Sequence, residues 1–469
     1  MEFVGRVAEQ ERLTRLLDQV RQTGAARMLA LRGRRQIGKS RMLEHWLEHA
    51  GAPYVFFQAT GETDGANEVA AFREGVERSG LPGAEVVAEA ATTWQSAFSV
   101  LAASVGQAGT PCVVVLDEFP YLFKGDASID GAFQLIWDKM LNGKAPVFLI
   151  LVGSDLHMME LLGQYDRPLY GRVQEMVLEP LPPSQAARLT GLAGAAALDG
   201  YLITGGFPNL IECWQSGEDV WSFLGRLLDP NSPLIVNGER ILTSEFPAGS
   251  HPSDVLLAIG DGQAQYTSIQ QAAGVKDPTL QSALQVLASK GVIEIRRPLS
   301  TAGPGRNTRY EVVDPYLRFW LKFIRKALPE ISRGRPDLPL QAIQSAWNDY
   351  RGRAVEPIVR EAVARMLPDR ARFDDARFVG SYWTRSNVPE VDLVGVENQR
   401  KPSRIEFIGS IKWRDSVAFD GHDFATLAAV KGDVPGTDPN TKLIAVSHAG
   451  FRTSAPDVAL GADDLLAAY

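Results

Sequence analysis

The sequence predicts an α/β protein of several domains, the first of which is built on a parallel, doubly wound sheet. Over residues 1–180, apolar strand patterns alternate with helical patterns, which is typical of a parallel sheet covered by helices on both faces. One of these strands runs directly into a glycine-rich loop and a helix. The chain has 469 residues, more than one hydrophobic core usually organises, so we expect roughly two to four domains.

The composition is that of an ordinary globular protein, with 45% hydrophobic and 22% charged residues. No apolar run approaches the roughly 20 residues that cross a bilayer, and the first residues lack the apolar core of a signal peptide. We therefore expect a cytoplasmic protein with no membrane contact. The net charge of −8 argues against a wholly basic nucleic-acid-binding surface, although a local basic face could still bind phosphates.

The cysteines and histidines form no ligand pattern in the sequence. Cys112 lies in an apolar run and Cys213 lies beside a tryptophan, so both are interpreted as packed thiols. His45 and His49, four residues apart on a predicted helix, are interpreted as part of a solvated face.

The strongest motif in the chain is RMLALRGRRQIGKSRMLEHWL, residues 27–47. A strand at residues 28–31 leads into the pattern GxxxxGK[ST] and then into a helix, which is the setting that this motif requires. Small residues at this spacing let successive backbone N–H groups surround phosphates at a helix N-terminus. Lys39 would reach the β- and γ-phosphates of ATP, and Ser40 would bind Mg²⁺. The predicted nucleotide-binding residues are Gly33, Arg34, Arg35, Gln36, Ile37, Gly38, Lys39, Ser40 and Arg41.

Two further apolar strands end in polar residues that suit the same chemistry. The run CVVVLDEFPYLF, residues 112–123, would deliver Asp117 to the Mg²⁺ shell, and Glu118 after it could polarise the attacking water. A glutamate at that place favours hydrolysis over nucleotide binding alone. The run APVFLILVGSD, residues 145–155, has Ser154 at its end, where it could sense the γ-phosphate. In a parallel sheet these carboxyl ends of strands are where ligands bind.

With these motifs, the chain resembles the archaeal-type P-loop ATPases, a branch close to AAA+ and STAND proteins that also occurs in bacteria. FVGRVAEQERL, residues 3–13, matches the family's signature near the adenine, and ITGGFPNLIECW, residues 203–214, matches its GG-x-P lid motif. RPLYGRVQEMVLEPL, residues 167–181, matches a further segment, in which Arg172 could act on the γ-phosphate. A surface arginine that binds a helix end is the alternative interpretation of Arg172. The resemblance covers nearly the whole chain and implies ATP and Mg²⁺ as cofactors.

Residues 252–313 are predicted to form three short helices and a β-hairpin, which is the plan of a winged helix. In DNA-binding proteins of this plan the last helix enters the major groove. The presumed recognition helix carries no arginine, so a module that only packs against its neighbours is the alternative. Four arginines of the wing could meet DNA phosphates, namely Arg296, Arg297, Arg306 and Arg309.

A linker is predicted at residues 336–342, before a long helix over residues 343–367 and a set of strands. In the family this region resembles a PD-(D/E)xK restriction-endonuclease-like fold. In that motif the acids bind Mg²⁺ and the lysine orients water. The resemblance places the motif at Glu356 on the helix, Asp392 on the second strand, and Ser410 and Lys412 on the third.

Ser410 stands where the motif requires a glutamate. A neutral hydroxyl cannot replace the charge of a carboxylate next to a hard dication. Glu406 faces the same side of the strand but lies about 13 Å from Ser410, whereas Glu390 lies only about 6.6 Å along the strand from Asp392. We therefore expect a degenerate nuclease-like domain, with Glu390 as the acid best placed to substitute.

The leading hypothesis is a Mg²⁺-dependent ATPase whose nucleotide state controls a winged helix and a degenerate nuclease-like domain, acting on DNA or on a protein partner. One alternative is an ATP-regulated, metal-dependent nuclease with a defence or toxin-like role. The other is a nucleotide-switched DNA-binding regulator without significant turnover. Each is compatible with a homo-oligomer. The predicted domains are an ATPase core at residues 1–180, a helical lid at 181–250, a winged helix with its connecting helix at 251–335, and the nuclease-like domain at 336–469.

Overall fold

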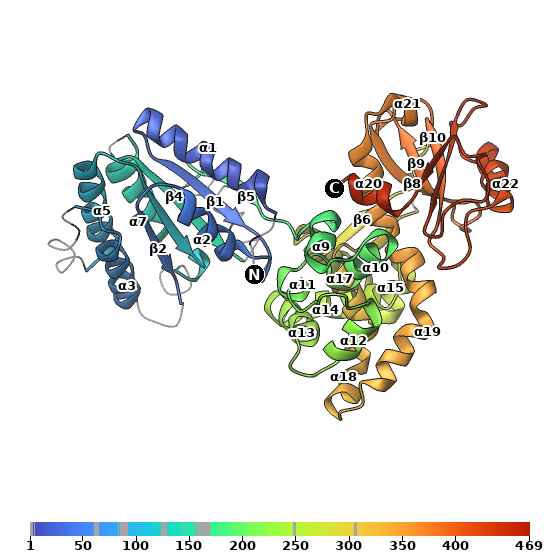
Figure 1. The fold of residues 1–469 in the computed structure, drawn as a ribbon, viewed down its shortest axis with the longest axis horizontal. Helices are drawn as coiled ribbons and strands as arrows, with labels where there is room; N and C mark the ends of the chain where they lie inside the picture. Colours follow the sequence, from blue (N-terminus) through green and yellow to red (C-terminus); the bar gives the residue numbers. More distant parts are fainter. Residues whose placement is uncertain are drawn as a thin grey trace. The chain divides into compact units, whose positions relative to one another are not determined.

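The computed structural model divides into two compact units, Met1–Pro180 and Leu181–Tyr469, and each is described by itself (Figure 1). Among the described residues, no helix combines the length and the apolar content that crossing a membrane requires. The structure describes all residues except 1, 2, 4, 61–64, 83, 85–91, 123–128, 144, 155–158, 160–168, 247–249 and 304–306.

The first unit is built on a five-stranded parallel sheet with the order β2-β3-β4-β1-β5. β3 and β4 are buried along their whole length, as continuous runs of Val, Leu and Ile predict for central strands of a parallel sheet. The predicted α/β fold with a parallel sheet is thus confirmed. The strands are β1 (Arg27–Arg32), β2 (Tyr54–Gln58), β3 (Cys112–Asp117), β4 (Val147–Gly153) and β5 (Gln174–Val177).

Helices cover both faces of this sheet. Successive residues of a strand point to opposite faces. On β4, the ring of Phe148 packs edge-on against Trp46 of α2, whereas Leu149 belongs to the core that also holds Phe72 of α3 and Phe98 of α5. This packing fixes α2 at the point where the loop after β1 ends. The helical segments are α1 (Val7–Thr23), α2 (Lys39–His49), α3 (Gly65–Arg78), α5 (Trp94–Ala108), η1 (Phe119–Tyr121), α7 (Ile129–Ile136) and η2 (Trp137–Leu141).

The second unit starts with a helical region in which a pair of glycines permits very close packing. Gly205 and Gly206 follow α10 with φ values of 58° and 76°. A Cβ atom on Gly206 would lie 2.1 Å from the carbonyl oxygen of Leu181, and one on Gly205 would lie 2.8 Å from the backbone nitrogen of Tyr316. Only glycine fits at both positions. The helices are α9 (Pro183–Thr190), α10 (Gly194–Thr204), α11 (Pro208–Ile211), α12 (Val220–Leu227) and α13 (Pro233–Glu245).

Three helices and an antiparallel hairpin follow. The hairpin consists of β6 (Ile293–Arg296) and β7 (Arg309–Val312), and an isolated bridge joins Gln265 to Arg309. The next helices are anchored to α13, because the Tyr316 hydroxyl donates a 2.9 Å hydrogen bond to the carbonyl oxygen of Leu234. The helical segments here are α14 (His251–Gly260), α15 (Tyr266–Ala273), α16 (Asp277–Ser289), α17 (Pro315–Phe319), η3 (Trp320–Ile324) and α18 (Arg325–Ser332).

A mixed five-stranded sheet ends the chain, in the order β12-β11-β10-β9-β8. β8, β9 and β10 pair antiparallel, and β10, β11 and β12 pair parallel. The strands are β8 (Phe378–Trp383), β9 (Glu390–Val396), β10 (Phe407–Lys412), β11 (Lys442–Ser447) and β12 (Val458–Leu460). The helical segments are α19 (Asp337–Ala354), α20 (Glu356–Met366), α21 (Arg370–Phe373), α22 (Gly421–Val430), η4 (Lys431–Asp433) and α23 (Ala462–Ala467).

The linker predicted at residues 336–342 is wrong, because α19 begins at Asp337 and includes nearly all of it. Pro336 and Pro339 lie just before and within the first turn, where backbone N–H groups have no helical acceptor, so they start the helix instead of interrupting it. The single helix predicted over residues 343–367 is two helices, α19 and α20, which are separated at Val355.

Candidate functional site

The loop between β1 and α2 has the backbone geometry of a phosphate cradle. Gln36 and Gly38 have φ values of 65° and 84°, so the chain turns sharply before the helix starts. A Cβ atom on Gly33 would lie 2.7 Å from the carbonyl oxygen of Leu178 and 2.5 Å from Cδ1 of Ile37. The first glycine of the motif is therefore required by close packing. The loop ends at the N-terminus of α2, where unpaired N–H groups favour an anion.

Lys39 lies over this loop as the first residue of α2. Its side chain is buried, and Nζ donates hydrogen bonds of 2.9 Å to the carbonyl oxygens of Gly33 and Arg34. Burial lowers the pKa of Lys39, while the charges of Glu118 and Asp117 act in the opposite direction. The ammonium group is thus held against the loop, where it could bind an anion.

The carboxyl end of β3 brings Asp117 next to Ser40. The Ser40 hydroxyl donates a 2.5 Å hydrogen bond to Oδ2 of Asp117, and the backbone N–H of Glu118 donates a 2.9 Å bond to Oδ1. Asp117 is buried, which raises its pKa, and these two hydrogen bonds act against that rise. Two oxygen groups suited to Mg²⁺ therefore lie side by side, from elements 77 residues apart.

Glu118 is held by its backbone and by Ser154. It has a φ of 50°, which is uncommon for a residue with a side chain and which turns the chain directly after β3. The hydroxyl of Ser154, which follows β4, donates a 2.9 Å hydrogen bond to Oε2 of Glu118. The structure thus brings together Lys39, Ser40, Asp117, Glu118 and Ser154, and their roles in hydrolysis stay predictions.

The other arginines predicted for this site are placed differently. Arg172 makes a two-bond ion pair with Asp138, with distances of 3.0 and 3.1 Å. Arg35 donates a 2.5 Å bond to the Tyr121 hydroxyl, and Arg41 is exposed on the first turn of α2. The role of Arg172 on a γ-phosphate stays a prediction.

One residue that holds the loop was not singled out from the sequence. Arg6 is buried and donates a 3.2 Å hydrogen bond from Nη2 to the carbonyl oxygen of Ile37, while its Nη1 pairs with Glu9 at 3.2 Å. Its position in the segment at residues 3–13, which matched a family signature, was the available signal. Arg6 ties the start of the chain to the middle of the phosphate loop.

The hairpin arginines are engaged within the second unit. Arg309 pairs with Glu390 at 2.5 Å, and its guanidinium carbon lies 4.5 Å from the ring centroid of Trp383. Arg296 pairs with Glu311 at 2.9 Å and also donates to the Ser381 hydroxyl.

Of the other two predicted DNA contacts, the structure describes only Arg297. Arg297 is exposed, and Arg306 lies outside the described residues. DNA contact by this hairpin stays a prediction, and for Arg296 and Arg309 it would require breaking the pairs above.

The residues of the nuclease-like motif gather between α20, β9 and β10. Oδ2 of Asp392 accepts hydrogen bonds from the backbone N–H of Ile411 at 2.8 Å and from the Ser410 hydroxyl at 3.4 Å. Burial raises the pKa of Asp392, and the charge of Lys412 acts against this rise. Ser410, which stands where the motif has a glutamate, therefore contacts the carboxylate of Asp392.

Glu356 is paired with an arginine of its own helix, Arg360. Burial raises its pKa to about 7; the charge of Arg360 opposes this shift and the charge of Asp392 adds to it. Nη1 of Arg360 donates a 3.1 Å hydrogen bond to Oε2 of Glu356. Glu390, the predicted substitute acid, is half-exposed and bound to Arg309, as described above.

A partly buried carboxylate, Glu311 on β7, connects the hairpin to this cluster. Arg296, Arg318 and Arg360 surround it at 2.9, 3.2 and 3.6 Å. Burial opposes its ionisation, but the three guanidinium groups together lower the pKa of Glu311. No sequence pattern predicts this network, because its members come from two strands and two helices with no common spacing.

Comparison with known proteins agrees with the first site. Residues 2–129 match the model of the AAA ATPase domain. Together with the loop geometry, this match identifies the first unit as a P-loop domain of the AAA ATPase class. Residues 320–423 match a family described as archaeal and bacterial proteins of unknown function.

The chain is also similar to individual proteins over much of its length. An uncharacterised protein of Methanocaldococcus jannaschii, MJECL04, is 25% identical over 419 residues, which cover 88% of each chain. The solved structure of the Walker-type ATPase PABY2304 of Pyrococcus abyssi has a TM-score of 0.52 and 18% identity, and the match covers 68% of this chain and 96% of that one. At this identity the likeness concerns the fold alone.

Proposed function

We propose that this protein is a Mg²⁺-dependent ATP hydrolase in which the nucleotide state of the first unit controls how the second unit acts on DNA or a protein partner. The observation that carries the proposal is the hydrogen-bonded pair of Ser40 and Asp117, next to Lys39 and Glu118. These groups would combine a cation site, an anion site and a base at the carboxyl ends of β1 and β3, the two strands that flank β4.

The residues present fit ATP and Mg²⁺. Ser40 and Asp117 supply hard oxygen ligands, and Mg²⁺, when bound, would neutralise phosphate charge. Lys39 is held by two weak neutral acceptors, so its ammonium group can exchange these carbonyl oxygens for phosphate oxygens, which are better partners for a buried cation. Glu118, oriented by Ser154, would accept a proton from the attacking water.

The test is ATP hydrolysis by Glu118→Gln. The substitution keeps the shape and one acceptor oxygen but removes the basic carboxylate, so nucleotide affinity should be retained while turnover falls at least about 100-fold. Glu175→Gln, a change at an exposed glutamate of β5, is the matched control. Equal turnover by wild type and Glu118→Gln would remove Glu118 as the base, and the absence of Mg²⁺-dependent hydrolysis by wild type would exclude the enzyme.

For the second unit, we propose a winged helix followed by a degenerate PD-(D/E)xK-like domain. The order of three helices and a hairpin supports the first part, and the placement of Asp392, Ser410 and Lys412 on neighbouring strands supports the second. The donor set does not fit Mg²⁺, since Glu356 is paired with Arg360 and residue 410 is neutral. Metal-dependent cleavage of DNA by the purified wild type would overturn the assignment as degenerate.

A further inference from the structure

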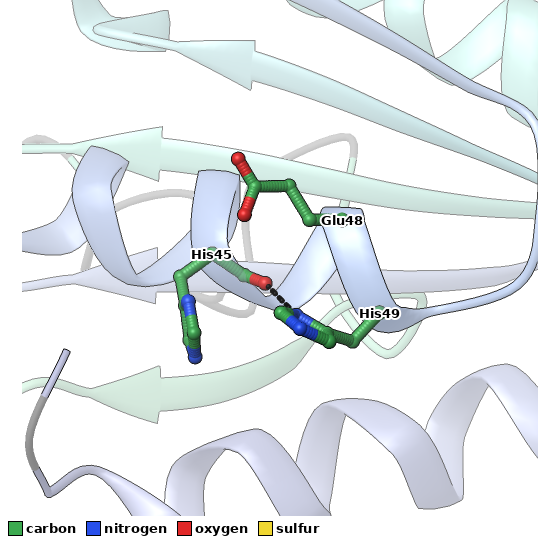
Figure 2. A group of neighbouring side chains, drawn as sticks. All are labelled: His45, Glu48 and His49. Atoms are coloured by element: carbon green, nitrogen blue, oxygen red, sulfur yellow. Dashed lines mark hydrogen bonds between the residues drawn. The ribbon is translucent and has the colours of Figure 1, made fainter. Parts of the chain in front are cut away.

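The last turns of α2, away from the phosphate loop, carry three potential metal ligands on one side. His45, Glu48 and His49 each offer one ligand atom, and these atoms all lie within 4.8 Å of one another (Figure 2). Glu48 and His49 are exposed and His45 is half-buried. Residues three and four positions apart are neighbours on a helix, so the grouping follows from α2 itself and needs no long-range contact.

The spacing of the two imidazoles suits a shared ion. The ring centroids of His45 and His49 are 4.9 Å apart. With metal–nitrogen bonds of about 2.0–2.1 Å, two rings on one ion have centroids roughly 4.5 Å apart at a right angle and roughly 5.2 Å apart at the tetrahedral angle. The observed spacing lies between these limits. The ligand atoms themselves need to be about 3.3 Å apart around such an ion, so small side-chain movements bring them together from within 4.8 Å.

Both rings are already oriented. Nδ1 of His49 lies 2.8 Å from the carbonyl oxygen of His45 (Figure 2). This hydrogen bond assigns the proton to Nδ1 and leaves the lone pair of Nε2 available, which is how metal-bound histidines are usually held. The ring of His45 stacks on Phe3, with centroids 4.3 Å apart and an angle of 16° between the planes. Binding would therefore require less ordering than two free surface histidines would.

We propose that His45, Glu48 and His49 bind a divalent first-row transition metal ion, with Zn²⁺ as the type case and at least one coordination position open to solvent. Two imidazoles and a carboxylate suit Zn²⁺, Ni²⁺ or Cu²⁺, whereas Mg²⁺ and Ca²⁺ prefer all-oxygen sites. The site is separate from Ser40 and Asp117, since Ser40 lies in the first turn of α2 and the histidines lie in its last turns.

The position of these three residues at the C-terminal end of α2 also favours binding of a cation. The last carbonyl groups of a helix have no intrahelical partner and carry partial negative charge, so a cation there is stabilised. A bound ion would link two consecutive turns of α2 through His45 and His49. We infer a structural role: the ion would stabilise the C-terminal end of the helix that bears the phosphate loop.

The test is titration of Zn²⁺ into the nucleotide-free full chain by calorimetry, with Co²⁺ absorption reporting the ligand type. Wild type should bind one equivalent of Zn²⁺, and the double variant His45→Ala/His49→Ala should not bind it. Glu48→Gln should lower the Zn²⁺ affinity by about tenfold or more. His251→Ala/His422→Ala removes two exposed imidazoles from the second unit and should bind like wild type.

Nucleotide binding by Glu48→Gln and by the control pair should be unchanged. Circular dichroism shows whether the double variant, which also loses the stacking of His45 on Phe3, is folded. Zn²⁺ should also raise the melting temperature of wild type but not of His45→Ala/His49→Ala. The proposal is overturned if the double variant still binds one equivalent of Zn²⁺ or if the control variant does not. Binding by wild type only at millimolar Zn²⁺ would also overturn it.

Discussion

Replacing Glu356 by glutamine should stabilise the second unit at neutral and alkaline pH but not in acid. Burial raises the pKa of Glu356 to about 7 from a reference of 4.5, so the folded state binds its proton more tightly than the unfolded state. Between these two values the stability of the wild type should fall as pH rises, and above pH 7 the full cost of ionising the buried group should be present. That cost is on the order of 3 kcal/mol.

The assay is urea unfolding at pH 5 and pH 8, followed by tryptophan fluorescence. Glu356→Gln should gain roughly 2–3 kcal/mol over wild type at pH 8 and little at pH 5, because the wild-type carboxyl is protonated there. The matched control is Glu361→Gln, at an exposed acid one turn further along α20, which should show no such difference. An equal gain for Glu356→Gln at both pH values would show that the effect comes from packing and would refute the electrostatic argument.

The same assay separates a degenerate site from a working one. If Glu356 and Asp392 held a cation, Mg²⁺ would stabilise wild type more than Glu356→Gln at pH 8. Both proteins share the proposed Mg²⁺ site at Ser40 and Asp117, so only a difference between them reports on Glu356. We expect no difference, because Glu356 is paired with Arg360.

Three further changes test the other assignments. Lys39→Ala should abolish ATP binding in a fluorescent-nucleotide titration, since it removes the buried cation of the loop; retained affinity would contradict the cradle. Ser154→Ala should lower kcat about 10–100-fold with little change in nucleotide affinity, because the lost hydrogen bond orients Glu118; an unchanged kcat would make Ser154 incidental. Glu390→Gln should strengthen low-salt DNA binding by releasing Arg309, measured by fluorescence anisotropy, and no DNA affinity in either protein would make the hairpin a packing module.

The first site was predictable because its chemistry is local in sequence. The motif from Gly33 to Ser40 encodes strand, turn and helix together, and the parallel sheet then places Asp117 at the same edge. The role of Arg6 was not predicted, because a single arginine forms no sequence pattern with the loop. Its hydrogen bond to Ile37 joins residues that are 31 positions apart.

The second site was only partly predictable for the opposite reason. The sequence located Asp392, Ser410 and Lys412 on strands, but it could not show which charges face them. Arg309 and Glu390 are 81 residues apart, and only the fold brings the hairpin to β9. The predicted linker at residues 336–342 is instead the start of α19, because its prolines lie before and within the first turn, where no helical N–H donor is needed.

The charges around Ser410 explain how a nuclease-like cluster can persist without its second acid. Buried carboxylates are costly unless positive charge lies near them, and in a working site a metal ion supplies it. Here side chains supply it, because the acids Glu311, Glu356 and Asp392 are matched by Arg296, Arg318, Arg360 and Lys412. A glutamate at position 410 would restore the motif, but Arg360 would still pair with Glu356 and compete with the metal for it. Recovery of metal binding should therefore require Ser410→Glu together with Arg360→Gln. Titration of Mn²⁺ into the single and double variants tests this, and tight binding by Ser410→Glu alone would show that Arg360 does not compete.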